Sequence, residues 1–300
     1  MGDYHVHLHP HGPHRGEGPE PGIYPPGHIE AYIETASARG VAEVGFTEHL
    51  YRCAESAAAL GRFWETEPLA DLAADTERFV LEDRTLSLDG YVEAVVTAKE
   101  EGLPVLLGLE VDFFPETIGA VLDLIAPYPW DFLVGSVHWI GGWSYDRRAA
   151  SYEFERRGVR RSYEEYFAIE AQLAASGAVD VLAHVDAVKK TGFSLPEPPV
   201  DLYEPVVAAA AASGTAVEIN TSGLRHPCRQ IFPHPTLLSM FHGAGVPITV
   251  SSDAHRPGDV ASSFDEALRL ARSVGYRERL RFVAGEAMAV PLPEDARMAQ

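Results

Sequence analysis

Three observations predict an α/β fold built on a parallel β-sheet of barrel size. Short apolar runs alternate with longer amphipathic stretches, as expected for repeated βα units. Seven such runs occur, and six of them end in a residue type that binds metals. In a parallel barrel all strand ends of one kind lie on a single face, so these residues are expected to meet there. The predicted strands cover residues 4–8, 41–46, 104–109, 132–137, 179–183, 216–219 and 247–250.

Helices are predicted between the strands, where apolar residues recur at helical spacing and Gly or Pro marks many of the exits. These segments are residues 28–39, 91–101, 163–175, 202–212 and 264–273. Two segments depart from the minimal rhythm: an insertion at about 52–90 and a long aromatic and basic loop at about 141–161. Long loops after barrel strands usually shape substrate access. Neither segment has the composition of a linker, so residues 1–300 are expected to form a single domain.

Composition restricts the class of partner. A net charge of −20 disfavours extended contact with nucleic acid, which requires clustered Lys and Arg. A small anionic substrate remains compatible with this charge, because bound divalent cations reverse the field of a site. Two cysteines cannot form a disulfide framework, and no apolar stretch reaches the length of a membrane span. We therefore expect a cytoplasmic protein with no nucleic-acid or membrane partner, and the sequence leaves the oligomeric state open.

The strand ends carry the residues that indicate a metal site. His5 and His7 lie two apart in a strand, so both imidazoles can face one point. Histidine combined with carboxylates suits Zn, Fe or Mn, and the number of such side chains predicts two or three divalent ions. His28, His234 and His242 are expected to be structural or solvated, Trp139 and Trp143 to pack, and His9 to be either. The other candidate ligands are His49, Glu110, His138, His184, Asp253 and His255.

Several motifs resemble those of the PHP (polymerase and histidinol phosphatase) family, most closely its histidinol-phosphate phosphatase branch. They run in order along most of the chain: DYHVH at 3–7, FTEH at 46–49, GLEVDF at 108–113, GSVHWIGGW at 135–143, AHVDAVKK at 183–190, INTSGLRHP at 219–227 and SSDAHRP at 251–257. The resemblance implies a distorted (β/α)7 TIM-like barrel, a single PHP-type domain with a trinuclear metal site at the carboxyl-terminal face of the strands.

By this resemblance the eight strand-end residues are metal ligands, joined by a ninth from the early loop. The family usually has a histidine six residues after the second histidine of the first pair, and Pro13 stands at that position here. His14 is the favoured ninth ligand, since the Gly-Glu-Gly that follows it resembles the family pattern, and His11 is the alternative.

A site of this kind hydrolyses phosphomonoesters by attack of a metal-activated hydroxide and needs no Ser or Cys nucleophile. Asp253, His255 and Arg225 are the expected catalytic residues, and His226 or a metal-bound water could protonate the leaving group. Arginines can hold phosphate oxygens in a bidentate manner. The expected substrate-binding residues are Arg225, Arg256, Asp186 and Lys190.

The resulting hypothesis is a histidinol-phosphate phosphatase of histidine biosynthesis, which converts L-histidinol phosphate and water to L-histidinol and phosphate. A PHP enzyme acting on another small phosphate ester is the main alternative, and the acidic charge disfavours an exonuclease. An amidohydrolase-type hydrolase is less favoured, because its fourth strand commonly carries a carboxylated lysine where this chain has His138. A metal-storing or regulatory barrel with a vestigial site is disfavoured by the complete ligand set.

Overall fold

Seven parallel strands form the centre of the molecule. The computed structural model describes residues 1–293, and its main sheet has the strand order β1-β2-β3-β4-β7-β8-β9. Every neighbouring pair in this sheet is parallel. Each of the seven predicted strands is present, and the predicted α/β fold class is confirmed. The strands are β1 (Gly2–Val6), β2 (Glu43–Phe46), β3 (Val105–Asp112), β4 (Phe132–Ser136), β7 (Val181–Leu182), β8 (Ala216–Asn220) and β9 (Ile248–Ser251).

The sheet curls into a nearly closed barrel. The first strand meets the segment that follows the last one, where the His7 amide donates to the Ala254 carbonyl at 2.8 Å. Val6 and Ala254 form an isolated parallel bridge at the same place. The ring is uneven, because β7 has only two residues in the ladder. Because all seven strands are parallel, their carboxyl ends lie on one face of the barrel, as predicted.

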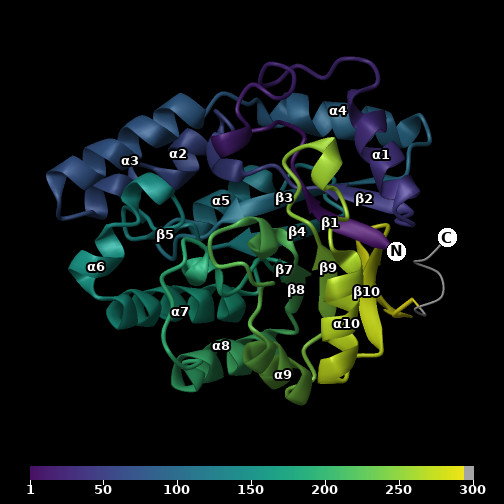
Figure 1. Ribbon diagram of the computed structural model, residues 1–300. Helices are drawn as coiled ribbons and strands as arrows, with labels where there is room; N and C mark the ends of the chain where they lie inside the picture. Colours follow the sequence, from purple (N-terminus) through teal and green to yellow (C-terminus); the bar gives the residue numbers. More distant parts are fainter. Residues whose placement is uncertain (294–300) are drawn as a thin grey trace.

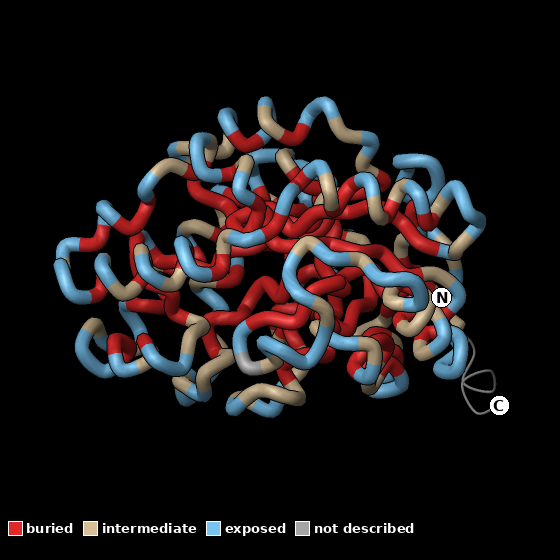
Figure 2. Tube along the Cα trace, turned by 90° about the horizontal axis from the view of Figure 1, so that it is seen from above, coloured by how far each residue is buried: buried red, intermediate tan, exposed pale blue. Residues whose placement is uncertain are grey.

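Helices surround the strands on the outside (Figure 1). The buried part of the chain lies centrally, and exposed positions follow the outer helices and loops (Figure 2). Within residues 1–293 no helix combines the length and apolar character needed to cross a bilayer. Around the barrel all five predicted helices are present, with two further ones after β3 and β8. The helices are α1 (His28–Ala38), α4 (Leu88–Glu100), α5 (Ile118–Ile125), α7 (Val159–Ser176), α8 (Val200–Ser213), α9 (Pro235–Gly243) and α10 (Phe264–Val274).

The two long segments pack against each other beside the barrel. The Trp139 ring lies 5.0 Å from Phe63 and 5.7 Å from Phe114, and is almost fully buried. Trp143 is also buried, and its indole nitrogen donates to the Ala150 carbonyl at 3.0 Å. Both tryptophans therefore pack, as expected. The insertion contains α2 (Ser56–Leu60), η3 (Phe63–Thr66) and α3 (Ala70–Asp83), and the later loop contains β5 (Trp139–Ile140), β6 (Trp143–Ser144), η4 (Arg148–Ala150) and α6 (Glu153–Arg157).

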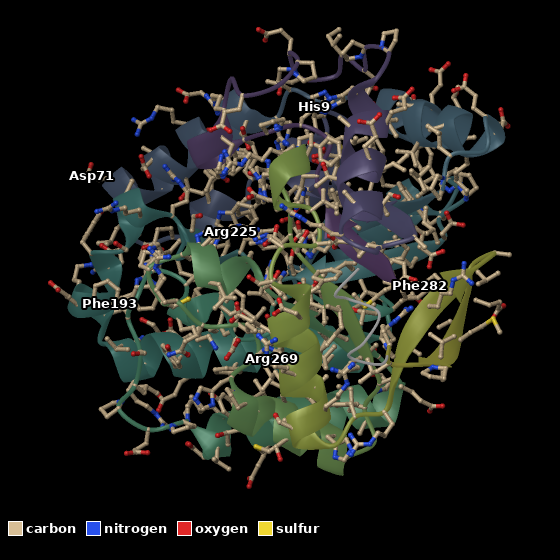
Figure 3. All side chains as sticks on the ribbon, turned by 45° about the vertical axis from the view of Figure 1, so that its right-hand side comes forward. His9, Asp71, Phe193, Arg225, Arg269 and Phe282 are labelled. Atoms are coloured by element: carbon tan, nitrogen blue, oxygen red, sulfur yellow. The ribbon has the colours of Figure 1, made fainter. Side chains whose placement is uncertain are left out.

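An antiparallel hairpin covers the amino-terminal end of the barrel, and sequence patterning did not predict it. It consists of β10 (Glu278–Val283) and β11 (Glu286–Pro291). Phe282, labelled in Figure 3, stacks on Phe132 with ring centroids 4.8 Å apart and meets Tyr4 edge-on at 5.4 Å. Gly45 and Gly108 make room for the Phe132 ring, since a Cβ at either position would lie 2.6 or 2.7 Å from it. An apolar cluster thus fills the end of the barrel away from the predicted site.

Candidate metal centre

Glu110 lies at the centre of the predicted ligand set. Glu110 lies near the carboxyl end of β3, and its side chain is fully buried. Its Oε2 lies 2.6 Å from Nδ1 of His49 and 3.4 Å from Nε2 of His5. Its Oε1 lies 3.4 Å from Nε2 of His138 and 3.3 Å from Nε2 of His184. Four strand ends therefore bring imidazoles to one carboxylate.

Asp253 supplies a second carboxylate on the other side of the first strand. Its Oδ1 lies 3.4 Å from Nε2 of His7 and 3.8 Å from Nε2 of His5. The same oxygen is 3.5 Å from Nδ1 of His255. The backbone of Asp253 has φ +51°, a strained value for a residue with a side chain, and the Ser222 hydroxyl holds the other oxygen at 3.0 Å. Strain of this kind is typical of functional sites, where it aims a side chain.

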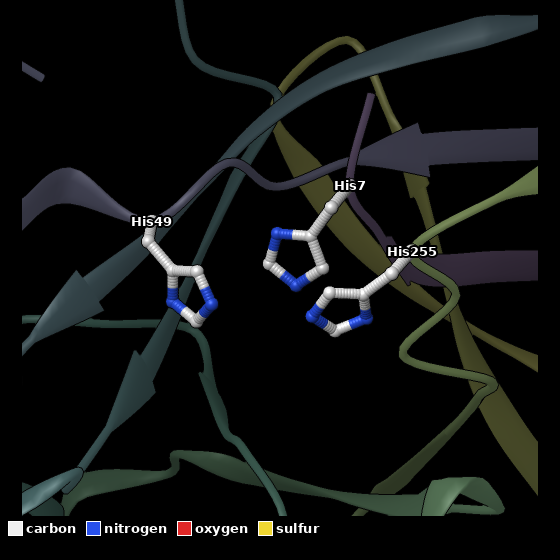
Figure 4. A group of neighbouring side chains, drawn as sticks. All are labelled: His7, His49 and His255. Atoms are coloured by element: carbon white, nitrogen blue, oxygen red, sulfur yellow. The ribbon is translucent and has the colours of Figure 1, made fainter. Parts of the chain in front are cut away.

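Three imidazole nitrogens converge where the early loop meets the site. Nε2 of His11 lies 3.0 Å from Nε2 of His49 and 3.0 Å from Nε2 of His255. Figure 4 shows His49 and His255 with His7, three imidazoles that reach the same region from separate parts of the chain. Nitrogen lone pairs at this separation repel unless a proton or a cation lies between them. The geometry suits a cation with histidine ligands.

His14, the favoured ninth ligand, lies at the edge of this group. It ends the short helix η1 (Gly12–His14), and its Nδ1 lies 3.1 Å from Oε1 of Glu17 in an exposed pair. Its ring centroid is 6.3 Å from that of His255. His11, which precedes η1, is the early-loop histidine that the structure brings into contact with the other ligands.

The buried polar atoms of the site fit bound divalent ions. Among the described residues, Nε2 of His5, Nε2 of His7, Nδ1 of His49 and both oxygens of Glu110 are buried without a well-aligned hydrogen bond, despite the short distance between His49 and Glu110. Such atoms are costly to bury unless they bind something. Ligand atoms lie within 4.8 Å of one another in four groups of three. These groups are His7–His49–His255, His5–His7–Glu110, His5–His184–Asp253 and His49–Glu110–His138.

The electrostatics favour the ligand forms of Glu110 and His11, whereas nearby carboxylates outweigh the effect of burial and raise the pKa of His5. Burial alone would raise the pKa of Glu110, but the adjacent imidazoles of His49 and His5 hold it well below its ordinary value. Burial lowers the pKa of His11 well below its ordinary value, and the guanidinium of Arg52 lowers it further. An ionised carboxylate and a neutral imidazole are the forms that bind a metal.

Buried carboxylates lie behind the predicted ligands, and sequence patterning did not single them out. Glu218 on β8 accepts from Nδ1 of His5 at 3.0 Å and from the amide of His184 at 2.7 Å. Asp112 lies 3.0 Å from Nδ1 of His138. A carboxylate on the far nitrogen fixes the tautomer and direction of a metal-binding histidine. The signal available in the sequence was a charged residue inside an apolar run, Glu218 in AVEIN.

Lys190, a predicted substrate-binding residue, forms an ion pair with a residue of the long loop. Its Nζ donates to Oδ2 of Asp146 at 2.9 Å. Burial would lower the pKa of Lys190, but Asp146 and then Asp253 raise it, so the side chain stays a cation. Burial, followed by the charge of Lys190, lowers the pKa of His226 to about 3. Asp146 comes from the long loop at 141–161 and was not singled out in the sequence.

Arg225 and Arg256 make contacts within the protein. Arg225 donates from Nη2 to the Ser252 carbonyl at 2.7 Å and to the Asp253 carbonyl at 3.1 Å, which supports the strained backbone there. Figure 3 labels Arg225. The half-exposed Arg256 pairs with Asp259 at 2.9 Å and, at the mouth of the site, with Glu17 at 3.0 Å.

Asp186 and the histidines outside the cluster also have defined partners. Asp186 accepts from Nζ of Lys189 at 2.7 Å and from the His234 amide at 2.8 Å. His234 caps α9 by accepting from the Thr236 amide, as expected for a structural histidine. His28 contacts the Leu8 carbonyl at 2.8 Å, and His9 contacts the Ile23 carbonyl at 3.2 Å. His242 packs on the ring of Tyr276.

Comparison with known proteins adds independent findings. A protein from Deinococcus radiodurans named probable histidinol-phosphatase is 35% identical over 193 residues, which cover 63% of this chain and 74% of that one. A Schizosaccharomyces pombe protein of the same name is 24% identical over 257 residues, covering 81% and 79%.

Solved structures share the fold. Histidinol phosphate phosphatase from Lactococcus lactis, complexed with zinc, L-histidinol and phosphate, superposes with a TM-score of 0.71 at 20% identity, over 96% of this chain and 98% of that one. A putative histidinol phosphatase from Listeria monocytogenes gives 0.68 at 18% identity, over 89% and 99%. The model of the PHP domain matches residues 26–222. With this match, its barrel and the histidines and carboxylates at its strand ends, the chain belongs to the PHP domain family.

Proposed function

We propose that this chain is a metal-dependent histidinol-phosphate phosphatase that hydrolyses L-histidinol phosphate to L-histidinol and phosphate. The observation that carries the proposal is the buried cluster of histidines around Glu110 and Asp253, with the cation of Lys190 on its edge. The names of the curated relatives and of the structural neighbours support the same substrate.

We propose that two or three divalent ions, Zn, Fe or Mn, occupy this cluster. Such ions lower the pKa of a coordinated water and neutralise the charge of the transferred phosphoryl group. In place of His14 we assign the early-loop position to His11, because its Nε2 lies 3.0 Å from two other imidazole nitrogens. The proposed ligands are His5, His7, His11, His49, Glu110, His138, His184, Asp253 and His255.

The other residues divide between substrate contact and support. Lys190 is proposed to bind a phosphoryl oxygen, with Asp146 holding its ammonium group in place. Arg225 is proposed to position Asp253 through the backbone it grips, and Asp186 to position Lys189. Arg256, which is half-exposed and pairs with Glu17, is proposed to contact the incoming substrate. His226 is neutral near pH 7 with a pKa of about 3, so it can donate a hydrogen bond to the leaving alcohol but is not a cationic acid.

We also propose that the enzyme works in the cytoplasm, because Cys53 and Cys228 are both free thiols, the form kept in a reducing compartment.

The test is phosphate release from a panel of histidinol phosphate, other small phosphomonoesters and short oligonucleotides, each with Mn, Zn or Fe supplied. We expect the highest kcat/KM for histidinol phosphate. Preference for a different monoester would move the assignment to another phosphatase of the same family, and preference for a diester would overturn it. Metal analysis of the reconstituted protein should give at least two ions per chain, and a single ion would contradict the multinuclear site.

A further inference from the structure

A second cavity lies at the opposite end of the barrel from the metal centre. It has a volume of about 300 Å³ and lies between the starts of β1 and β2 and the hairpin β10–β11. Glu43, the first residue of β2, and Arg279 and Arg281 of β10 line it, with Val290 on the facing strand. The metal ligands follow the other ends of the strands, so this cavity is separate from the proposed active site.

Arg279 is buried there without a counter-ion. It is 7% exposed, and its Nη1 donates to the Leu280 carbonyl at 3.1 Å. Its Nε is buried and has no hydrogen-bond partner. Within residues 1–293 no carboxylate forms an ion pair with Arg279. A guanidinium stays protonated in proteins, so its burial is costly unless an anion compensates the charge.

Among the described residues that line the cavity, the single carboxylate is already engaged. Glu43 pairs with Arg281 through two contacts, Nε to Oε1 at 2.9 Å and Nη2 to Oε2 at 2.7 Å. Its Oε1 also accepts from the Tyr4 hydroxyl at 2.5 Å. Within residues 1–293, two guanidinium groups therefore line this cavity against one carboxylate, in a protein whose net charge is −20. The excess positive charge is local and partly shielded from solvent.

We propose that this cavity binds a small anion whose carboxylate or tetrahedral oxyanion accepts hydrogen bonds from Arg279. A planar guanidinium presents donors in a fork that matches both groups, and such charge-assisted bonds are among the strongest in proteins. The bound anion neutralises Arg279 and links β10 to the barrel. Anion binding at this cavity increases the stability of the fold and does not involve the metal centre.

The test measures thermal unfolding of the metal-loaded protein while sulfate, inorganic phosphate or acetate replaces chloride at constant ionic strength. At ~100-fold excess over the dissociation constant, wild type should gain roughly 5 °C in Tm. The variant Arg279→Gln should lose this gain, and in chloride it should be at least as stable as wild type because no unpaired charge is buried. Comparing acetate with the two oxyanions identifies which class binds.

Two further variants control the interpretation. Arg269→Gln removes an exposed arginine that pairs with Asp265, and it should respond to anions as wild type does. Arg279→Lys keeps the charge and loses the fork, so its gain should be intermediate. Both Arg279 variants should keep wild-type phosphatase turnover. An anion-induced Tm gain in Arg279→Gln equal to that of wild type would overturn the proposal, since it would place the binding at another site such as the metal centre.

Discussion

The imidazole of His11 is held between two other imidazoles and a guanidinium. Its Nδ1 lies 3.1 Å from Nη1 of Arg52 and 3.3 Å from the carbonyl of His9. Arg52 is itself buried between Glu48, at 3.1 Å, and Asp83, at 3.3 Å. The direction of the His11 ring is therefore fixed by buried charges, whereas the His14 ring contacts the exposed carboxylate of Glu17.

This difference predicts opposite outcomes for two alanine variants. His11→Ala should remove one bound ion and lower kcat/KM by more than roughly 100-fold, since even outer partners of metal ligands are worth about 10- to 100-fold. His14→Ala, the matched control three residues away, should keep the ion and lose little activity. Metal analysis and steady-state kinetics check both. Loss of an ion in His14→Ala with retention in His11→Ala would show that His14 is the ligand.

Glu218 offers a second test at the scale of single residues. Besides His5 and His184 it accepts from the Ser251 hydroxyl at 2.5 Å and from the Asn220 amide at 2.6 Å. Glu218→Gln keeps the shape but cannot accept at both oxygens, so His5 loses the partner that fixes its tautomer. We expect metal affinity, measured by competition with a chelator, to fall by about 10- to 100-fold. Ser251→Ala removes a single donor and should have a much smaller effect; equal affinities for wild type and Glu218→Gln would refute this role.

The strand-end residues could be predicted because a parallel barrel dictates where its strand ends meet. Glu110 and Asp253 lie within contact of the histidines for that reason. The choice between His11 and His14 depended on the path of an irregular loop, which residue spacing does not determine. Glu218 and Asp146 have no spacing signature either, since each acts by contacting a residue far away in the sequence.

At the scale of elements, the loop at 141–161 supplies a carboxylate to the site. Asp146 follows β6, accepts from the Ser144 hydroxyl at 3.2 Å and binds Lys190. Burial would raise the pKa of Asp146, but Lys190 and His138 lower it, so the pair stays ionised. The loop therefore positions the cation proposed to meet the phosphoryl group.

Asp146→Asn should weaken this positioning. We expect KM for the phosphate ester to rise by roughly tenfold, the free-energy equivalent of one charge-assisted hydrogen bond, with a smaller change in kcat. Asp75→Asn breaks the neighbouring contact to Arg147, at 3.0 Å, and is the control that should leave KM unchanged. A KM unaltered by Asp146→Asn would exclude the positioning role.

The elements themselves were predictable to different degrees. Parallel strands buried on both faces have continuous apolar sequences, so all seven were found. The third strand extends to Asp112, past the predicted end at residue 109. The prediction stopped early because the apolar run ends there, whereas Glu110 and Asp112 are polar residues that are buried in the site. The hairpin β10–β11 was missed because β11 is mostly exposed, although the alternation of arginine with apolar residues in β10 is a strand signal.

At the scale of the whole molecule, one buried acid outside the metal centre links stability to pH. Glu170 on α7 is fully buried, and burial raises its pKa from 4.5 to about 8 although the Tyr166 hydroxyl donates to it at 2.6 Å. The folded protein keeps a proton on Glu170 that the unfolded chain releases. This contribution to stability is present below about pH 4.5 and is lost as pH rises toward about 8.

Glu170→Gln should therefore stabilise the protein more at pH 8 than at pH 5. The amide keeps the shape of the acid and has no proton to lose, so the Tm difference between variant and wild type should increase between these values. Glu164→Gln, on the exposed face of the same helix, is the control and should show little pH dependence. Thermal unfolding across this range checks the prediction, which fails if the Glu170→Gln difference is the same at both pH values.

The seam between β1 and the segment after β9 has a consequence for how the protein folds. His5 and His7 lie at the first strand of the barrel, and Asp253 and His255 follow its last strand. The hydrogen bond from His7 to Ala254 joins these two ends of the chain in the middle of the ligand set. Contacts between such distant residues carry a large loop-closure entropy and form late. We therefore expect the proposed metal centre to be complete only once the barrel has closed, and metal binding to follow folding.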